Sequence, residues 1–128
     1  MACLASPAFG IITHAQGDDI PFDIFVDDPD ISLPTTQDKL TARLFFFDQP
    51  TMKMNRANGD DYAFDAPLDP SDPSLRHASF TASGLCAARS GTALLFIVVA
   101  DRPFSTTDPS VVVKGGGSDS NYWVLMCN

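Results

Sequence analysis

Glutamate is missing from this chain of 128 residues, and lysine occurs only three times. All 16 acidic residues are therefore aspartates, and against 8 lysines and arginines they leave a formal net charge of -8 at pH 7. Glutamate and lysine are the usual surface residues of helices, whereas aspartate, proline and glycine favour turns and caps. With 10 prolines and 8 glycines in addition, the composition argues against long helices and predicts an all-β fold.

The shortage of basic residues excludes two kinds of partner. A chain this acidic lacks the positive patch that phosphate backbones require, so we expect no nucleic acid partner. Anionic membrane surfaces are disfavoured for the same reason. The longest apolar run, residues 93–100, has the length of a strand and falls short of a membrane span. The N-terminal residues also lack the basic region of a secretory signal. We therefore expect no membrane partner.

Catalytic residues are scarce as well. His14 and His77 are the only imidazoles, and neither stands in a metal-binding His-x-His or His-Glu-x-x-His spacing. No Gly-x-Ser-x-Gly nucleophile elbow is present. The glycine run at 115–117 lacks the Lys-Ser/Thr pair of a phosphate-binding loop. We predict a protein without catalytic residues, metal or cofactor, and not an enzyme.

Aspartates cluster in four expected loops, at residues 18–19, 27–30, 60–61 and 69–72. Oxygen-rich loops at one end of a sandwich are suited to Ca²⁺, which takes six to eight oxygen ligands. The EF-hand pattern is absent, however, and loop aspartates are equally explained by turns that the side chain stabilises. We interpret the clusters as solvated loops.

Three cysteines, Cys3, Cys86 and Cys127, form no Cys-x-x-Cys pair and have apolar neighbours. An odd number of cysteines in such surroundings favours buried thiols in a reducing compartment. A bridge between Cys3 and Cys127, which would join the two termini, is the alternative.

Apolar residues alternate with polar ones in several segments, which is the period of a strand. Residues 20–26 and 39–47 show this most clearly, and 92–100 is apolar on both faces, as in a central strand. The segment 39–47 also becomes apolar on its second face toward its end, so we expect a loop or another protein to cover it there. Shorter strands are predicted at 10–14, 51–55, 62–64, 76–81, 111–114 and 122–127.

These segments, separated by turn signals, predict one Ig-like β-sandwich of about seven to nine short antiparallel strands over residues 10–128. Residues 83–89 are expected to form one helical turn or a compact loop. Residues 1–9 are expected to form an apolar arm that precedes the sandwich. The centre of the core is predicted at Leu44, Phe46, Phe96 and Val98.

Some apolar residues are candidates for a partner surface. The arm would expose Leu4 and Phe9 unless something covered them, and aromatic residues are enriched at interfaces. We therefore predict contacts with a partner, and a homo-oligomer, through five residues: Leu4, Phe9, Phe45, Phe47 and Trp123.

The segments 16–27 and 38–47 together resemble a bacteriophage domain. A Gly-Asp turn at 17–18 leads into an alternating strand, a loop rich in proline and aspartate, and a long strand that opens Asp-Lys-Leu-Thr-Ala. This order is similar to the N-terminal Ig-like domain of upper baseplate proteins and related tail or fibre-attachment proteins. Lys39 interrupts the Asp-Leu-Thr run of that pattern, and the glycine before Ala42 is missing.

The resemblance implies a non-catalytic sandwich in a virion assembled in the host cytoplasm, with other virion proteins as partners. A capsid decoration protein of similar architecture is equally compatible. The alternative is a ligand-binding sandwich for carbohydrate or for a Ca²⁺-dependent partner.

Overall fold

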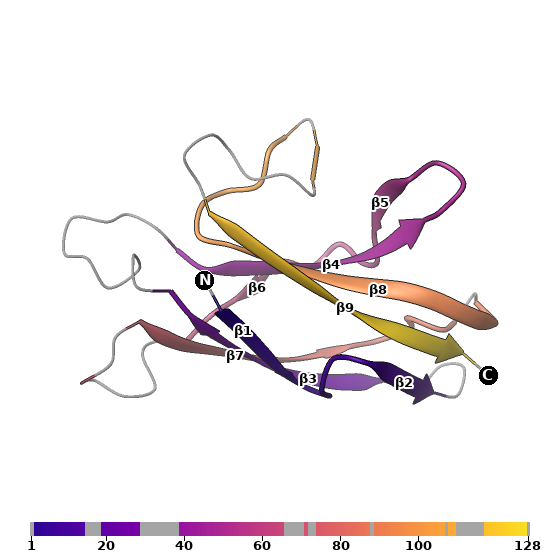
Figure 1. The fold of residues 1–128 in the computed structure, drawn as a ribbon, viewed down its shortest axis with the longest axis horizontal. Helices are drawn as coiled ribbons and strands as arrows, with labels where there is room; N and C mark the ends of the chain where they lie inside the picture. Colours follow the sequence, from indigo (N-terminus) through magenta and orange to yellow (C-terminus); the bar gives the residue numbers. More distant parts are fainter. Residues whose placement is uncertain are drawn as a thin grey trace.

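The computed structural model describes residues 2–14, 19–28, 39–65, 71, 74–87, 89–106, 108–109 and 117–127. Within these residues it contains nine strands and no helix. The strands form two sheets that pack face to face (Figure 1). The prediction of an all-β sandwich is confirmed.

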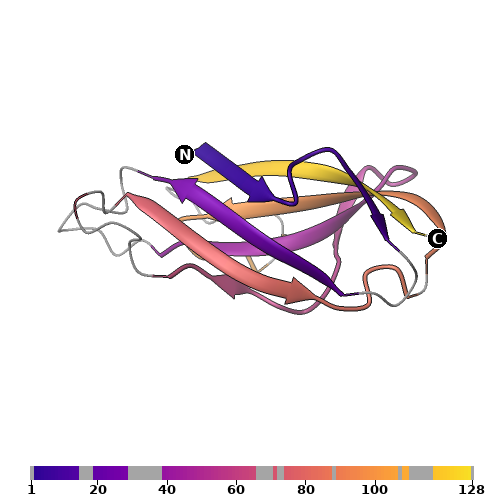
Figure 2. The same cartoon turned by 90° about the horizontal axis from the view of Figure 1, so that it is seen from below.

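The smaller sheet has three antiparallel strands in the order β1 (Ala2–Ser6), β3 (Ile20–Asp27) and β7 (Leu75–Ala82). Figure 2 shows it from its outer side. The N-terminal segment expected to be an arm outside the sandwich is thus a strand of this sheet, since β1 pairs with β3 along its whole length. Backbone pairing with a strand distant in the sequence has no local signal, so the composition of residues 1–9 alone did not reveal it.

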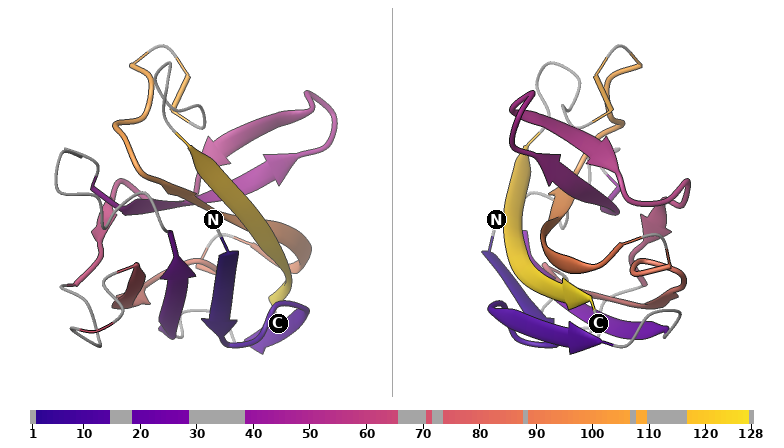
Figure 3. Two further views of the ribbon diagram at one scale, coloured as in Figure 1. Left: turned by 60° about the vertical axis from the view of Figure 1, so that its left-hand side comes forward. Right: turned by 90° about the vertical axis from the view of Figure 1, so that its right-hand side faces the viewer.

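The larger sheet has the order β2 (Ile11–His14), β9 (Ser118–Cys127), β8 (Gly91–Ala100), β4 (Thr41–Asp48) and β5 (Lys53–Arg56), with β6 (Tyr62–Ala63) also pairing with β4. Every pairing is antiparallel except that of β2 with β9, which is parallel, so the expectation of purely antiparallel strands is wrong at this edge. The chain crosses from one sheet to the other between β1 and β2. The β4–β5 hairpin extends away from the sandwich (Figure 3).

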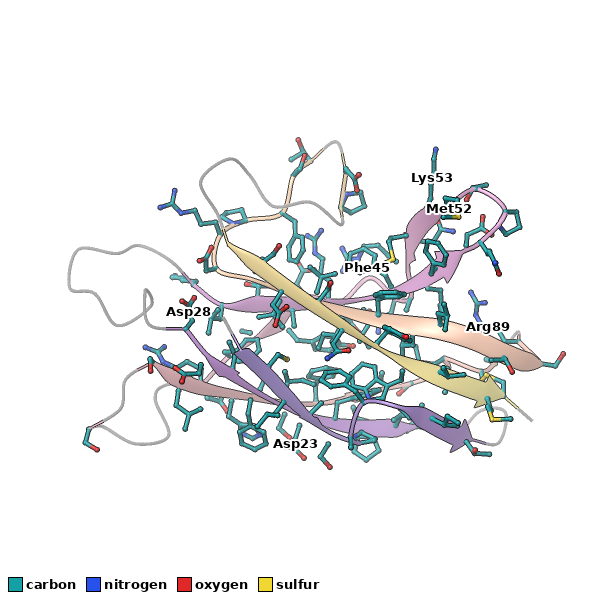
Figure 4. All side chains as sticks on the ribbon, in the orientation of Figure 1. Asp23, Asp28, Phe45, Met52, Lys53 and Arg89 are labelled. Atoms are coloured by element: carbon teal, nitrogen blue, oxygen red, sulfur yellow. A yellow bond between two sulfur atoms is a disulfide. The ribbon has the colours of Figure 1, made fainter. Side chains whose placement is uncertain are left out.

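The core lies between the sheets and follows from the alternation. Phe22, Ile24 and Val26 on β3 are fully buried, as are Ala42 and Leu44 on β4. Side chains from both sheets fill this layer (Figure 4). Its centre is Trp123, whose ring lies 5.0 Å from that of Phe22 and 4.8 Å from that of Phe9. The indole nitrogen donates a hydrogen bond of 3.0 Å to the carbonyl oxygen of Pro7.

The predicted core centre is half right. Leu44 and Phe46 belong to the layer between the sheets, whereas Phe96 and Val98 project from the opposite side of the six-stranded sheet. Their strand, β8, is apolar on both sides, so its alternation does not identify the inner face.

In its described residues, 83–87 and 89–90, the connection between β7 and β8 is a compact turn without a helix. The amide of Ala87 donates to the carbonyl of Gly84, and that of Arg89 donates to the carbonyl of Cys86. This turn places Cys86 beside the end of β9, where it forms a disulfide with Cys127.

The disulfide overturns the prediction of three reduced thiols, and also the alternative bridge between Cys3 and Cys127. Cys3 lies on β1 near Asp119, at the opposite end of β9 from Cys127, and is a free cysteine. Spacing along the chain does not reveal which cysteines meet. The strand expected at 111–114 lies outside the described residues.

Candidate interaction surface

An aromatic row crosses the outer side of the six-stranded sheet, the side turned away from the core. Phe96 on β8 is paired directly with Phe45 on β4 and with Tyr122 on β9. The rings of Phe96 and Tyr122 are stacked at 5.1 Å, and that of Phe47 lies 6.1 Å from that of Phe96. Directly paired residues share one face of a sheet, so these rings form a continuous apolar surface.

One end of this outer side is covered by the chain itself. Phe104, from the segment after β8, packs with Phe45, Val98 and Ala100 in a second buried cluster. The guanidinium of Arg43 lies 4.3 Å from the centre of the Phe104 ring, and its Nη1 donates to the carbonyl of Pro109. At Arg43 and Phe45 the expected covering of the second face of residues 39–47 is thus supplied by a loop, whereas Phe47, at the end of that segment, is only partly buried. In Figure 4 Phe45 lies on this outer side, opposite to Asp23.

The other end is uncovered. Ile11 is 70% exposed, Tyr122 46% and Met126 41%. Ile11 is paired with Val124, and Val124 with Leu94, both partly buried, so apolar residues continue across β2, β9 and β8. We call this surface the apolar face; it consists of Ile11, Phe47, Met54, Leu94, Phe96, Tyr122, Val124 and Met126.

None of the residues of the apolar face carries a charge, although the chain has a formal charge of -8. An ionic group lies on the same side of the sheet, at the border of the apolar face with the covered end. There Asp61 accepts hydrogen bonds from Arg43 at 2.7 Å and from Arg56 at 2.8 Å. The bond from Arg43 is the main reason why the pKa of Asp61 is below its usual value. Both guanidinium groups therefore form an ion pair with Asp61 of the same chain.

The five predicted partner residues do not form one surface. Phe47 belongs to the apolar face, and Phe45 lies on the same side of the sheet but is fully buried under the covering loop. Trp123 is fully buried in the core, and Phe9 packs against it. Leu4 is 73% exposed but lies on β1 in the other sheet. Trp123 and Phe45 therefore offer no exposed surface in this structure, and Phe9 packs in the core instead of on an outer arm.

The sequence reasoning missed most of the apolar face. In β9, Trp123 alternates with Tyr122 and Val124, so both sides of the strand are apolar. The alternation indicated two apolar sides, and only the packing against β3 shows that Trp123 faces inward.

A polar cluster lies on the outer side of the three-stranded sheet. The Nε2 atom of His77 is 2.8 Å from a carboxylate oxygen of Asp23, and its Nδ1 atom is 3.9 Å from Asp65. The ring of Phe25 stacks on His77 at 4.6 Å. The hydrogen bond from His77 holds the pKa of Asp23 below its usual value, with a smaller effect from Ser79. Both imidazole nitrogens therefore face carboxylates.

The aspartate clusters have varied surroundings. Asp27 accepts a hydrogen bond of 2.7 Å from the Ser74 hydroxyl, and Asp61 is held by two arginines, as described. Asp18, Asp30 and the cluster at 69–72, apart from Ser71, lie outside the described residues. In the part of the chain that the structure describes, no group of three or more His, Cys or Asp side chains is arranged to hold a metal ion.

Comparisons of the chain with protein-family models, with curated proteins and with solved structures find no match. No helix in the described ranges is long and apolar enough to cross a membrane.

Proposed function

We propose that this chain is a non-enzymatic structural protein of a tailed bacteriophage particle and that it acts through protein–protein contacts. The observation that carries the proposal is the apolar face. The face joins three exposed residues on β2 and β9 to partly buried apolar residues on β8, β4 and β5. A contiguous apolar patch of this kind is a feature of interaction sites, because monomeric proteins rarely leave such patches in contact with water. Aromatic residues and methionine are enriched in interfaces, and the face contains both.

The assignment to a phage particle is supported by the resemblance of residues 16–27 and 38–47 to the Ig-like domain of baseplate and tail proteins. The described part of that segment forms β3 and β4, one in each sheet of a β-sandwich, which agrees with the fold class that the resemblance implies. Tail, baseplate, neck, fibre-attachment and capsid-decoration positions are all compatible with it.

Mass spectrometry of purified particles tests the first part of the proposal, because the chain should be found at a fixed stoichiometry. Hydroxyl-radical footprinting of the same particles tests the second part. Tyr122 and Met126 should be oxidised more slowly in the particle than in the isolated chain, since a partner covers them. Leu4, which is exposed on the other sheet, is the internal control. Absence of the chain from particles, or equal oxidation of the apolar face in both samples, would refute the corresponding part.

The alternative function, a module that binds carbohydrate or a Ca²⁺-dependent partner, gives different results. The exposed Tyr122 ring is a surface on which a sugar ring could stack. Retention of the chain on a glycan column that is lost in Tyr122→Ala, or a melting temperature that falls on addition of EDTA, would favour that alternative. We expect neither result.

A further inference from the structure

We infer that Asp119 and Asn121 close an open edge of the larger sheet, so that another chain cannot add a strand beside the first half of β9. This role goes beyond the proposed function and does not rest on it, because it concerns the edge of the sheet and not its apolar face. The short pairing of β2 with β9 and two hydrogen bonds within β9 support it.

The first half of β9 lies at an edge of the sheet. β9 is ten residues long, but β2 pairs only with its last four, from Val124 to Cys127 (Figure 1). β1 passes close to β9 but pairs only with β3. Among the described residues, no strand therefore pairs with 118–123 on the side that β2 occupies further along. Unpaired backbone groups at such an edge are a template for a strand of another chain.

The backbone groups that face this open side can be identified from β2. The amide of Val124 donates a hydrogen bond of 2.6 Å to the carbonyl of Gly10, so the backbone groups of Val124 point toward β2. Successive residues of a strand direct their backbone groups to alternate sides. Those of Ser118, Ser120 and Tyr122 therefore point to the same side as those of Val124, and an added strand would have to pair with them.

Side chains of β9 itself already occupy two of these amides. The amide of Ser120 donates a hydrogen bond of 3.0 Å to Oδ1 of Asp119, and that of Tyr122 donates one of 2.9 Å to Oδ1 of Asn121. Aspartate and asparagine side chains can compete in this way with the hydrogen bonds of a sheet. Each bond satisfies a donor that a new strand would need, so strand addition must first break it.

Asp119 is a second obstacle, because it lies on the inner side of β9. By the alternation along the strand, its side chain shares a side with that of Trp123, which is fully buried. Asp119 is half-buried, and its charge contributes to the raised pKa of the Cys3 thiol, which places the carboxylate close to β1. An added strand would cover this carboxylate, and burial of an unpaired charge is unfavourable. Inward-pointing charged side chains are one means by which proteins protect sheet edges.

Removal of the two acceptor oxygens tests the inference. Asp119→Val/Asn121→Val leaves the amides of residues 120 and 122 without a side-chain acceptor, and valine favours strands. In the dilute full chain, amide hydrogen exchange measured by NMR should show the protection factors of these two amides reduced about two- to tenfold. At higher concentration, light scattering should show more oligomer than in wild type, and in that oligomer the same two amides should become protected.

Ser118→Val/Ser120→Val is the matched control. It places two valines on the same strand, at exposed residues, and keeps both acceptor oxygens. It should therefore associate no more than wild type. Asp119→Asn separates the hydrogen bond from the charge, because it keeps an acceptor oxygen and removes the carboxylate. It should leave the protection factor of the Ser120 amide unchanged.

Circular dichroism melting establishes whether each variant is folded, and Asn121→Val alone replaces the double variant if that variant does not fold. Unchanged protection of the uncapped amides would overturn the inference, as would an oligomer in which they stay unprotected. Equal association of Asp119→Val/Asn121→Val and the matched control would overturn it as well. In that case the added hydrophobic surface, and not the loss of the two hydrogen bonds, would drive association.

Discussion

The disulfide between Cys86 and Cys127 should contribute a large part of the stability of this sandwich. It closes a loop with a sequence separation of 41. In the chain-entropy treatment, a loop of that length removes about 13 cal/mol/K from the unfolded ensemble, or about 4 kcal/mol at 25 °C. Domains of this kind have a total unfolding free energy of about 5 to 15 kcal/mol, so the loss of the bond would remove at least a quarter of it.

The corresponding change in melting temperature follows from the size of the chain. At about 2.1 cal/mol/K per residue, 128 residues have an unfolding entropy of about 0.27 kcal/mol/K. A loss of about 4 kcal/mol therefore lowers the melting temperature by about 15 °C. Scanning calorimetry of the chain with and without a phosphine reductant measures this shift, and a non-reducing peptide map identifies the bond.

Cys3→Ala is the control, because that variant keeps the disulfide and should show the same shift on reduction. The double variant Cys86→Ala/Cys127→Ala should melt near the reduced wild type and should not respond to reductant. Alkylation of Cys86 and Cys127 in the native, unreduced chain would refute the reasoning. A shift on reduction smaller than about 3 °C would refute it as well, since that corresponds to less than about 1 kcal/mol.

Three further predictions concern single side chains. Trp123→Phe should lower the free energy of unfolding by about 1 to 3 kcal/mol in a denaturant titration, because the Pro7 carbonyl loses its donor; an unchanged midpoint would contradict the buried hydrogen bond. The hydrogen bond from His77 lowers the pKa of Asp23 in the folded chain. Asp23 therefore stabilises the fold fully at a pH above its unfolded pKa of about 3.9. This contribution is lost as the pH falls through the lower pKa of the folded chain. Asp23→Asn should therefore destabilise the chain at neutral pH, and its difference from wild type should shrink as the pH falls below about 4; a difference independent of pH in thermal melts would be evidence against this role. Burial, together with the charge of Asp119, raises the pKa of the Cys3 thiol to about 11. At pH 8 iodoacetamide should therefore modify Cys3 about a hundredfold more slowly than an unperturbed cysteine. Equal modification rates in the native and unfolded chains would disprove this protection.

The strands that cross the middle of each sheet could be predicted from the sequence alone. Alternation over 20–26 and 39–47 and the apolar run at 92–100 predicted β3, β4 and β8, each within about two residues of its observed bounds. The absence of glutamate and the abundance of proline and aspartate correctly indicated an all-β chain. These signals are local, because the period of two arises from the backbone geometry of each strand by itself.

The tertiary structure decided the properties that depend on residues distant in the sequence. Residues 2–6 became a strand because β3 offers its edge to them, and Cys86 bonded to Cys127 because a turn between the sheets ends beside β9. On β8 and β9 both sides are apolar, so the sequence could not show that Trp123 faces the core and Tyr122 the solvent. That choice is made by the three-stranded sheet, which covers only one face of the larger sheet and leaves the other to a loop and to solvent.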